Sequence, residues 1–321
     1  MNARRRPWPR LVRLLHALIR PEYCFRPQQY RVRWRQRGHP AERAVVTLPW
    51  GLRLSLRPRE YMHSQIWLHG IYDLWVTETL WRLLDEGDLA IDAGANIGYM
   101  TSIMAARVGR AGKVIAGEPL PENAVILKEN VGRWVLENGL DQVAVHELAL
   151  GENGGLARFK VPLDPGNLGL GTLVEPLVES DSSTKAGNSG LIEVKVERLD
   201  HLIASESFVA LLKIDVEGHE LQVLRGAEKL LAAKRIRDIV FEEHRAYPTP
   251  VTRHLEDFGY RVYRLAGGFF GPALALASGK HSPPRGLDEP SFLATRDPVR
   301  AEKRLRKKGW HSLGNHQQSD A

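Results

Sequence analysis

The chain has 321 residues, 43% of them hydrophobic, and a net charge of +7. This is enough sequence to bury a substantial core in one large domain, with or without appendages. A single cysteine, Cys24, excludes an intramolecular disulfide and favours a reducing, cytoplasmic setting. No run of 18 apolar residues occurs, so no transmembrane helix is expected, and no signal peptide fits the N-terminus.

Positive charge is concentrated near the two ends of the chain. Residues 1–45 contain twelve arginines and only two acidic residues, and a second basic cluster lies at 300–310. Residues 9–20 place leucines at helical spacing between arginines, which predicts an amphipathic helix. Two interpretations of this helix stay open: peripheral contact with an anionic membrane, or packing on the domain.

The middle of the chain alternates between strand and helix patterns. Strand-like alternation at 30–56 predicts a small β unit, and residues 71–88 predict a helix. From residue 89 onward, short apolar strands follow amphipathic helices in turn, which predicts a parallel sheet with helices on both faces. We therefore expect a basic N-terminal extension at 1–64, a main domain at 65–298 with a β-rich insert at about 154–199, and a basic tail at 299–321.

A glycine-rich turn, DAGANIG at 92–98, follows the first strand of this pattern. Its glycines let a ligand approach the backbone, and the next helix begins with free N–H groups. Glu118 ends the next strand, where a carboxylate can bind both hydroxyls of a ribose. The loop reads D-x-G-x-x-x-G, so Asp92 would repel a pyrophosphate but suit an ammonium group. S-adenosylmethionine therefore fits better than NAD; the alternative is an ordinary strand–helix turn.

A second polar cluster lies where the fourth and fifth strands end. Lys213 and Asp215 share one face of a strand, and Glu217 and His219 follow them. The fifth strand ends with Glu242, Glu243 and His244. The cluster is either a structural Lys–Asp pair or a polar floor that positions or deprotonates a hydroxyl acceptor. No recognisable ligand spacing is present, so no metal site is predicted.

These segments together resemble the FkbM-type S-adenosylmethionine-dependent methyltransferases. The resemblance rests on IDAGANIGYMTSIMA, GEPLPENAVILKENV, LALGE, LLKIDVEGHELQVLRGAEKLL and IVFEEH, and covers roughly residues 65–265. It implies an α/β, Rossmann-like class I methyltransferase fold, with a seven-stranded sheet whose last strand is antiparallel. It also implies O-methylation of a hydroxyl, often on a sugar or a natural product. The basic amphipathic start of the chain adds a glycolipid as a further expected acceptor.

The resemblance also assigns roles to residues of this sequence. It places Asp92, Gly94, Asn96 and Gly98 at the methionine end of the donor, Glu118 on the ribose and Leu120 near the adenine. Asp215 and Glu217 would face the reaction centre. It assigns no catalytic base, and the polar residues at the strand ends themselves offer the candidates Asp215, Glu217, His219, Glu242 and His244. Gly117 departs from the family pattern, which has an aromatic residue before the glutamate.

Three other functions were weighed against this one. A nucleic-acid methyltransferase would use the basic arm, but no RNA-binding module is recognisable and the body of the chain is slightly acidic. The intact donor residues and the polar floor argue against a non-catalytic S-adenosylmethionine-binding protein. The loop chemistry argues against an NAD-dependent oxidoreductase. The expected partner is therefore a small-molecule or glycan hydroxyl acceptor.

Overall fold

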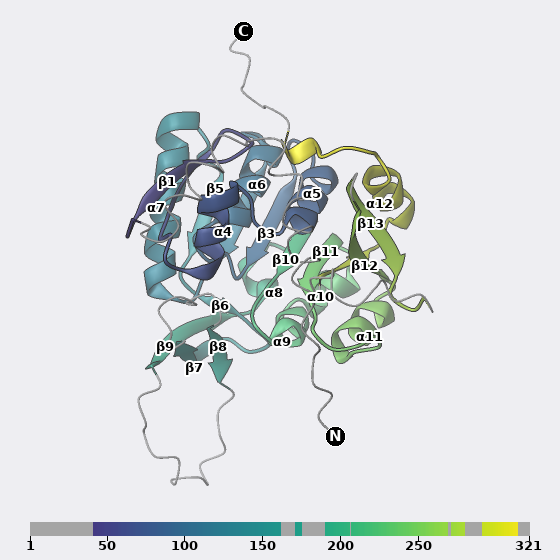
Figure 1. Cartoon of the computed structure of the whole chain (residues 1–321). Helices are drawn as coiled ribbons and strands as arrows, with labels where there is room; N and C mark the ends of the chain where they lie inside the picture. The colour runs from purple at the N-terminus through teal and green to yellow at the C-terminus, as the bar shows by residue number, and fades with distance from the viewer. Residues whose placement is uncertain are drawn as a thin grey trace, which may run out of the picture.

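The computed structural model describes residues 41–161, 171–174, 190–205, 207–268, 271–279 and 291–313. Its centre is an eight-stranded sheet with the order β13-β12-β14-β11-β10-β3-β4-β5 (Figure 1). The strands are β3 (Leu89–Ala93), β4 (Lys113–Gly117), β5 (Val143–His146), β10 (Val209–Ile214), β11 (Ile236–Glu242), β12 (Arg261–Gly268), β13 (Gly271–Leu276) and β14 (Ser291–Thr295). The five strands from β5 to β11 are mutually parallel.

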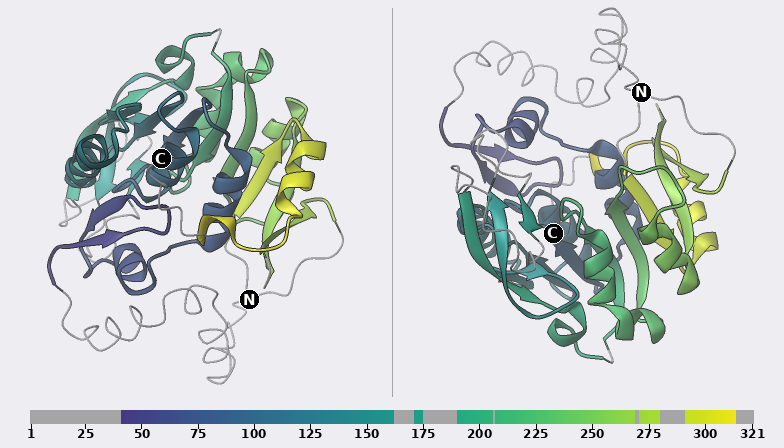
Figure 2. Two further views of the ribbon diagram at one scale, coloured as in Figure 1. Left: turned by 90° about the horizontal axis from the view of Figure 1, so that it is seen from above. Right: turned by 90° about the horizontal axis from the view of Figure 1, so that it is seen from below.

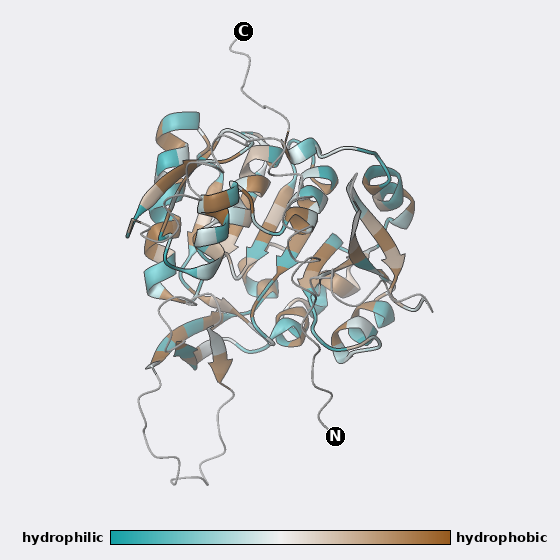
Figure 3. Ribbon diagram, in the orientation of Figure 1, coloured by the Kyte–Doolittle hydropathy of each residue, from teal (hydrophilic) through white to brown (hydrophobic). Residues whose placement is uncertain are grey.

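Helices cover both faces of this sheet, as the sequence predicted. One face packs against α5 (Leu74–Leu83), α6 (Tyr99–Val108) and α7 (Pro121–Asn138), and the other against α9 (Glu220–Arg225), α10 (Glu228–Ala232) and α11 (Pro250–Asp257). Every residue of β10 is buried, because both of its faces are covered. The apolar colouring of the central strands in Figure 3 reflects this double burial.

Two smaller β units flank the main sheet. The hairpin of β1 (Ala44–Thr47) and β2 (Arg53–Leu56) contacts α7, where Trp134 Nε1 donates to Arg53 O at 2.8 Å. A four-stranded sheet with the order β6-β9-β7-β8 lies beside the main sheet. Its strands are β6 (Ala149–Leu150), β7 (Gly155–Val161), β8 (Thr172–Val174) and β9 (Gly190–Glu197), and the last three lie within 154–199.

The antiparallel last strand is confirmed, but the strand count differs from the expected seven. Strand β14 inserts between β11 and β12 and runs antiparallel to both, and β13 adds an eighth strand at the edge. Between β10 and β11 the chain forms two short helices, α9 and α10. The second of these begins where the Asp200 carboxylate accepts hydrogen bonds from Lys229 N and Leu230 N, both at 3.1 Å.

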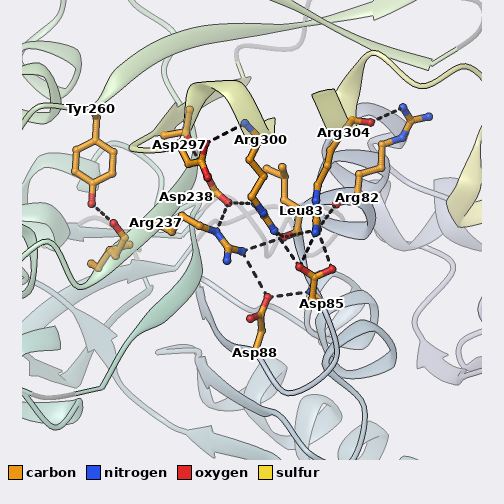
Figure 4. A network of polar contacts seen from close by, with 12 residues as sticks. Arg82, Leu83, Asp85, Asp88, Arg237, Asp238, Tyr260, Asp297, Arg300 and Arg304 are labelled. Carbon is orange, nitrogen blue, oxygen red and sulfur yellow. Dashed lines mark hydrogen bonds and ion pairs between the residues drawn. The ribbon is translucent and has the colours of Figure 1, made fainter. Parts of the chain in front are cut away.

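The expected basic tail at 299–321 is partly folded onto the body. Helix α12 (Pro298–Leu305) and the 3₁₀ turn η2 (His311–Leu313) both contact α5, and Figure 2 shows this yellow segment beside the blue helix. Arg300 binds the buried Asp238 at 3.1 Å, and Arg304 binds Asp85 at 2.7 Å (Figure 4). Because Arg300 and Arg304 are four residues apart, both side chains lie on the face of α12 that packs on the body. The basic composition of the tail did not predict these ion pairs.

Replacing Arg300 with methionine should lower the free energy of unfolding by roughly 2–4 kcal/mol, because Asp238 is fully buried and loses one of its two arginines. Arg306→Met is the control, since Arg306 pairs with Glu302 on the surface and should cost at most about 1 kcal/mol. Denaturant titration of both variants measures the difference. Equal losses would contradict a structural role for the C-terminal helix.

Two sequence predictions concern the membrane and the N-terminus. The amphipathic helix expected at 9–20 lies outside the described residues. Within the described ranges, no helix is both long and apolar enough to cross a bilayer. The described part of the N-terminal extension is the β1–β2 hairpin followed by α4 (Tyr61–His69), which leads into α5.

Candidate active site

A cavity of about 370 Å³ lies where β3, β4, β10 and β11 reach their carboxyl ends. This is the edge at which open α/β sheets bind ligands. Three parts of the chain contribute to its wall: the segment around α4 and α5, the strand ends, and the second sheet. The lining includes Glu60, Tyr61, Met62, His63, Tyr72, Asp73, Gly94, Asn96, Tyr99, Glu118, Phe159, Leu173, Lys213, Asp215, Glu217, Glu242 and His244.

The glycine-rich turn after β3 is pressed between the two neighbouring strands. The backbone N–H groups of Gly94 and Ala95 both donate to Gly117 O at 3.0 Å. On the other side, a Cβ added to Gly94 would lie 1.9 Å from Asp215 O, and the residue has φ +78°. Only glycine fits this position, because both the space and the backbone conformation exclude a side chain. Gly94 therefore lets the turn pack directly against the backbone that follows β10, and this packing places the turn in the cavity wall.

Glu118 lies at the end of β4 with its carboxylate already oriented. Oε2 accepts a hydrogen bond from Asn96 N at 2.8 Å, and Oε1 accepts one from Leu120 N at 3.0 Å. Burial raises the pKa of Glu118 to about 7, against the opposing effects of these hydrogen bonds and of Lys213. Each carboxylate oxygen keeps a lone pair for a further donor, so Glu118 can accept two hydroxyl groups from a ligand.

Lys213, on the central strand β10, lines the cavity between Glu118 and the acidic side chains of Asp215 and Glu242. Its ammonium group lies 3.2 Å from Asp92 Oδ1 and 3.3 Å from Asp215 Oδ2, and it donates to Gly94 O at 3.1 Å. The two aspartates raise the pKa of Lys213 against the effect of burial, so the lysine is charged at neutral pH. The Lys–Asp pair therefore has a structural role, because it ties the turn at Gly94 to β10. That the cluster also positions or deprotonates an acceptor stays a prediction.

Acidic side chains gather at the opposite end of the cavity from Glu118. Asp215, Glu217 and Glu242 all line it, and Glu242 Oε1 lies 3.2 Å from His244 Nε2. Burial first, and then the charge of Asp215, raises the pKa of Glu217 to about 7 and that of Glu242 to about 8. Both pKa values are close to neutral pH, where a side chain that transfers protons is most effective. Within the described ranges, no group of three or more acidic, histidine or cysteine side chains has the arrangement of a metal site.

Four predicted site residues lie outside the cavity lining. Asp92 is fully buried, where its Oδ2 accepts from Thr101 Oγ1 at 2.6 Å and its Oδ1 faces Lys213. Gly98 packs against α7, Leu120 lies in the core under the second sheet, and His219 Nδ1 is 3.3 Å from Thr172 Oγ1. The other seven predicted residues, Gly94, Asn96, Glu118, Asp215, Glu217, Glu242 and His244, come together in the lining.

Sequence reasoning missed the wall that precedes residue 89. His63 and Glu60 come from α4 and its N-cap, and Tyr72 and Asp73 precede α5. The position of Asp73 could have been predicted, because an aspartate directly before an apolar helix commonly caps it. In the structure Asp73 Oδ1 accepts a hydrogen bond from Val76 N at 3.1 Å. His63 carries no such signal, because its position depends on the packing of α4 over the turn.

Comparisons with known proteins identify the family. A family model described as the methyltransferase FkbM domain matches residues 92–262, just over half of the chain. The chain belongs to the FkbM methyltransferase family. It is an S-adenosylmethionine-dependent methyltransferase, and the match spans the turn, Glu118 and the acidic cluster described above.

Individual relatives agree with this assignment. Methyltransferase sdnD of Sordaria araneosa is 26% identical over 227 residues, which cover 64% of this chain and 83% of that protein. The 31-O-demethyl-FK506 methyltransferase FkbM of Streptomyces tacrolimicus is 32% identical over 178 residues, covering 50% and 67%. A solved FkbM methyltransferase from Methylobacillus flagellatus KT superposes with a TM-score of 0.39 at 18% identity, over 67% of this chain and 47% of that one.

The residues present fit the donor of the family. The turn at Gly94 and Asn96 lies in the cavity wall, Glu118 offers two acceptor oxygens for a ribose diol, and Asp215 and Glu217 place carboxyl groups near a cationic group. A pyrophosphate would instead be repelled by the carboxyl groups of Glu118, Asp215 and Glu217, and Lys213 is already paired with two aspartates. The FkbM-family site therefore has the charge that suits S-adenosylmethionine and opposes a dinucleotide.

Proposed function

We propose that this enzyme methylates a hydroxyl group of a sugar, glycolipid or natural-product acceptor. The observation that carries the proposal is the acidic end of the cavity, where Asp215, Glu217 and Glu242 meet the apolar side chains of Phe159 and Leu173 from the second sheet. Carboxylates accept hydrogen bonds from hydroxyl groups, and the apolar wall suits the carbon skeleton beside them. The name of the Streptomyces relative, which refers to an O-demethyl substrate, supports the same class of acceptor.

At the donor end, Glu118 binds the ribose and the turn at 94–98 lies along the methionine portion. Asp215 and Glu217 hold the cationic end close to the acceptor. When bound, S-adenosylmethionine supplies an activated methyl group that moves directly to the acceptor oxygen, so the protein's main task is alignment. Asp92 acts here through Lys213, which it holds under the turn.

At the acceptor end, Glu242 takes the proton that the hydroxyl loses. Its pKa of about 8 suits this task, because a base works best near the operating pH. His244 touches Glu242 at 3.2 Å and is 73% exposed, so it passes the proton on to solvent. Asp215 and Glu217 orient the hydroxyl group while Glu242 accepts its proton.

Titration of Glu118 gives the first test of the donor site. With a pKa of about 7, its ionised fraction rises between pH 6 and pH 8, so the affinity for S-adenosylmethionine should rise up to about tenfold over this range. The sign follows because the ribose hydroxyls donate to the ionised carboxylate. In Glu118→Gln the affinity for S-adenosylmethionine should be lower, and its rise between pH 6 and pH 8 should be smaller. Any pH dependence left in the variant comes from other groups. An identical slope in both proteins would contradict the assignment.

Glu242→Gln tests the acceptor end. After a screen of hydroxylated acceptors with S-adenosylmethionine carrying a labelled methyl group, the best acceptor is used for kinetics. The variant should lower kcat roughly 10²- to 10⁴-fold, with donor affinity unchanged, and remove the rise in rate through about pH 8.

Glu243→Gln is the matched control, since Glu243 binds Arg245 and does not line the cavity. It should retain the wild-type kcat. If Glu242→Gln also retained full activity, Glu242 would not be the base. If no hydroxylated compound accepted a methyl group, the acceptor class would be wrong.

Two further predictions from the sequence stay part of this proposal. A cytoplasmic setting follows from the single cysteine, and peripheral contact with an anionic membrane follows from the charge of the N-terminal segment. Residues 1–40 lie outside the described part of the chain. A vesicle co-sedimentation assay with phosphatidylserine liposomes, at low and high salt, measures the membrane contact.

A further inference from the structure

His63 stands out among the cavity residues because nothing in the reaction uses it. It lies on α4, 29 residues before the family-matched segment begins, and only 1% of it is exposed. It nevertheless lines the cavity together with Asn96 and Glu118. A buried polar side chain in such a place needs a partner.

The hydrogen bonds of His63 define its tautomer. Its Nδ1 accepts a hydrogen bond from Arg57 N at 3.3 Å, so the ring proton is on Nε2. Burial and the nearby charge of Arg57 lower the pKa of His63 to about 4, so the ring is neutral at physiological pH. Glu60 is 3.7 Å from Nδ1, too far for a hydrogen bond, and is itself paired with Arg57. His63 therefore offers one N–H donor, at Nε2.

Asn96 carries the complementary atom. Both His63 Nε2 and Asn96 Oδ1 are buried from water, and neither has a hydrogen-bond partner among the described residues. The two residues line the same cavity, and the polar side chain of Asn96 raises the pKa of His63, so the amide lies close to the ring. His63 Nε2 and Asn96 Oδ1 are thus a buried donor and a buried acceptor on neighbouring side chains, and a small movement would join them in a well-formed hydrogen bond.

Asn96 connects this contact to the donor site. It has φ +51°, a left-handed conformation that asparagine tolerates better than most residues, and its backbone N–H donates to Glu118 Oε2 at 2.8 Å. Asn96 is therefore one of two residues, with Leu120, whose backbone N–H groups orient the Glu118 carboxylate. A contact that holds the Asn96 side chain helps to hold its N–H on that carboxylate.

We propose that His63 is a positioning residue of the donor site: its Nε2–H binds Asn96 Oδ1 in the donor complex and keeps the Asn96 N–H on Glu118. The proposal rests on the proposed contact between Glu118 and the donor. It makes α4, a segment outside the family-matched residues, part of the donor-binding apparatus.

Two amide variants separate this role from a structural one. In His63→Gln the amide reaches the place of Nε2 and keeps the donor to Asn96, while Arg57 N loses its acceptor. In His63→Asn the amide takes the place of Nδ1, keeps the acceptor for Arg57 N and loses the contact with Asn96. Titration calorimetry with S-adenosylmethionine and S-adenosylhomocysteine measures affinity, and the melting temperature without ligand measures folding.

We expect His63→Gln to bind within about threefold of the wild type and His63→Asn to bind about ten- to hundredfold more weakly. In an Asn96→Ala background the two variants should no longer differ, because the contact they compare is gone. Equal affinities of the two variants, or the reverse order, would overturn the proposal. Parallel losses in affinity and melting temperature would show a purely structural role.

Glu118→Ala distinguishes failure of this inference from failure of the donor site. If Glu118→Ala loses binding while the two His63 variants bind alike, only the role of His63 is wrong. If Glu118→Ala keeps wild-type affinity, the donor contact is wrong, and the role of His63 falls with it.

Discussion

Gly94→Ala is expected to destroy the donor site. The new Cβ would lie 1.9 Å from Asp215 O and 2.9 Å from the carbonyl carbon, and both belong to backbone that follows a fully buried strand. Asp215 N is itself bound to Ala93 O at 3.1 Å, so neither segment can move away alone. Overpacking and left-handed strain together should cost on the order of 3–5 kcal/mol of folding free energy. The affinity for S-adenosylmethionine should fall more than about a hundredfold.

Gly70→Ala is the matched control for the backbone strain. Gly70 ends α4 with φ +81°, close to the value at Gly94, but a Cβ there meets nothing within 4 Å. It should therefore cost only about 1 kcal/mol and leave donor binding intact. Denaturant unfolding and titration calorimetry on both variants give the comparison. Similar losses in the two variants would mean that the contact between the turn and β10 does not shape the site.

Lys213→Met should be the second most damaging substitution. It removes three contacts at once and leaves Asp92, which has no exposed surface, without a counter-charge. Breaking a buried pair from one side costs roughly 3–5 kcal/mol, because the remaining charge stays desolvated. The raised pKa of Lys213 means that its contribution is fully present below the pKa of an unfolded lysine and is lost only as pH rises through the higher folded value. The loss should therefore be seen in full at pH 7.

A surface pair and a double variant serve as controls for Lys213. Lys128 binds Glu147 at 2.6 Å, but both side chains are more than 40% exposed, so Lys128→Met should cost at most about 1 kcal/mol. Asp92→Asn combined with Lys213→Met should recover part of the lost stability, since the buried charge is then removed as well. No recovery in the double variant would show that the ion pair is not the source of the effect.

The sequence predicted the parts of the site that depend on strand ends. Asp92 lies near the end of β3, and Glu118 directly follows the neighbouring strand β4. Because the carboxyl ends of parallel strands share one edge, Glu118 and the turn could be placed together from the alternation alone. The same argument brought Asp215 and Glu242 together, at the ends of β10 and β11. The local sequence pattern was sufficient to place these four residues, because each lies within two positions of the end of its strand.

What the sequence missed depends on contacts between distant segments. The sequence predicted Asp92 beside the donor, but its side chain is bound to Lys213, which lies 121 positions later, and is absent from the cavity lining. His63 reaches the cavity only because α4 folds over the turn, and Arg300 joins the body only because Asp238 is buried without enough positive charge. Hydrophobic periodicity does not encode such pairings, so they appear only in the folded chain.

Titration calorimetry of the full chain with S-adenosylmethionine, and separately with NADH, tests the central claim most directly. The account predicts that the wild type binds S-adenosylmethionine and not NADH, and that Glu118→Ala lowers the affinity by about a hundredfold or more while remaining folded. Unchanged affinity in Glu118→Ala, or binding of NADH in preference to S-adenosylmethionine, would contradict the placement of the donor at this carboxylate.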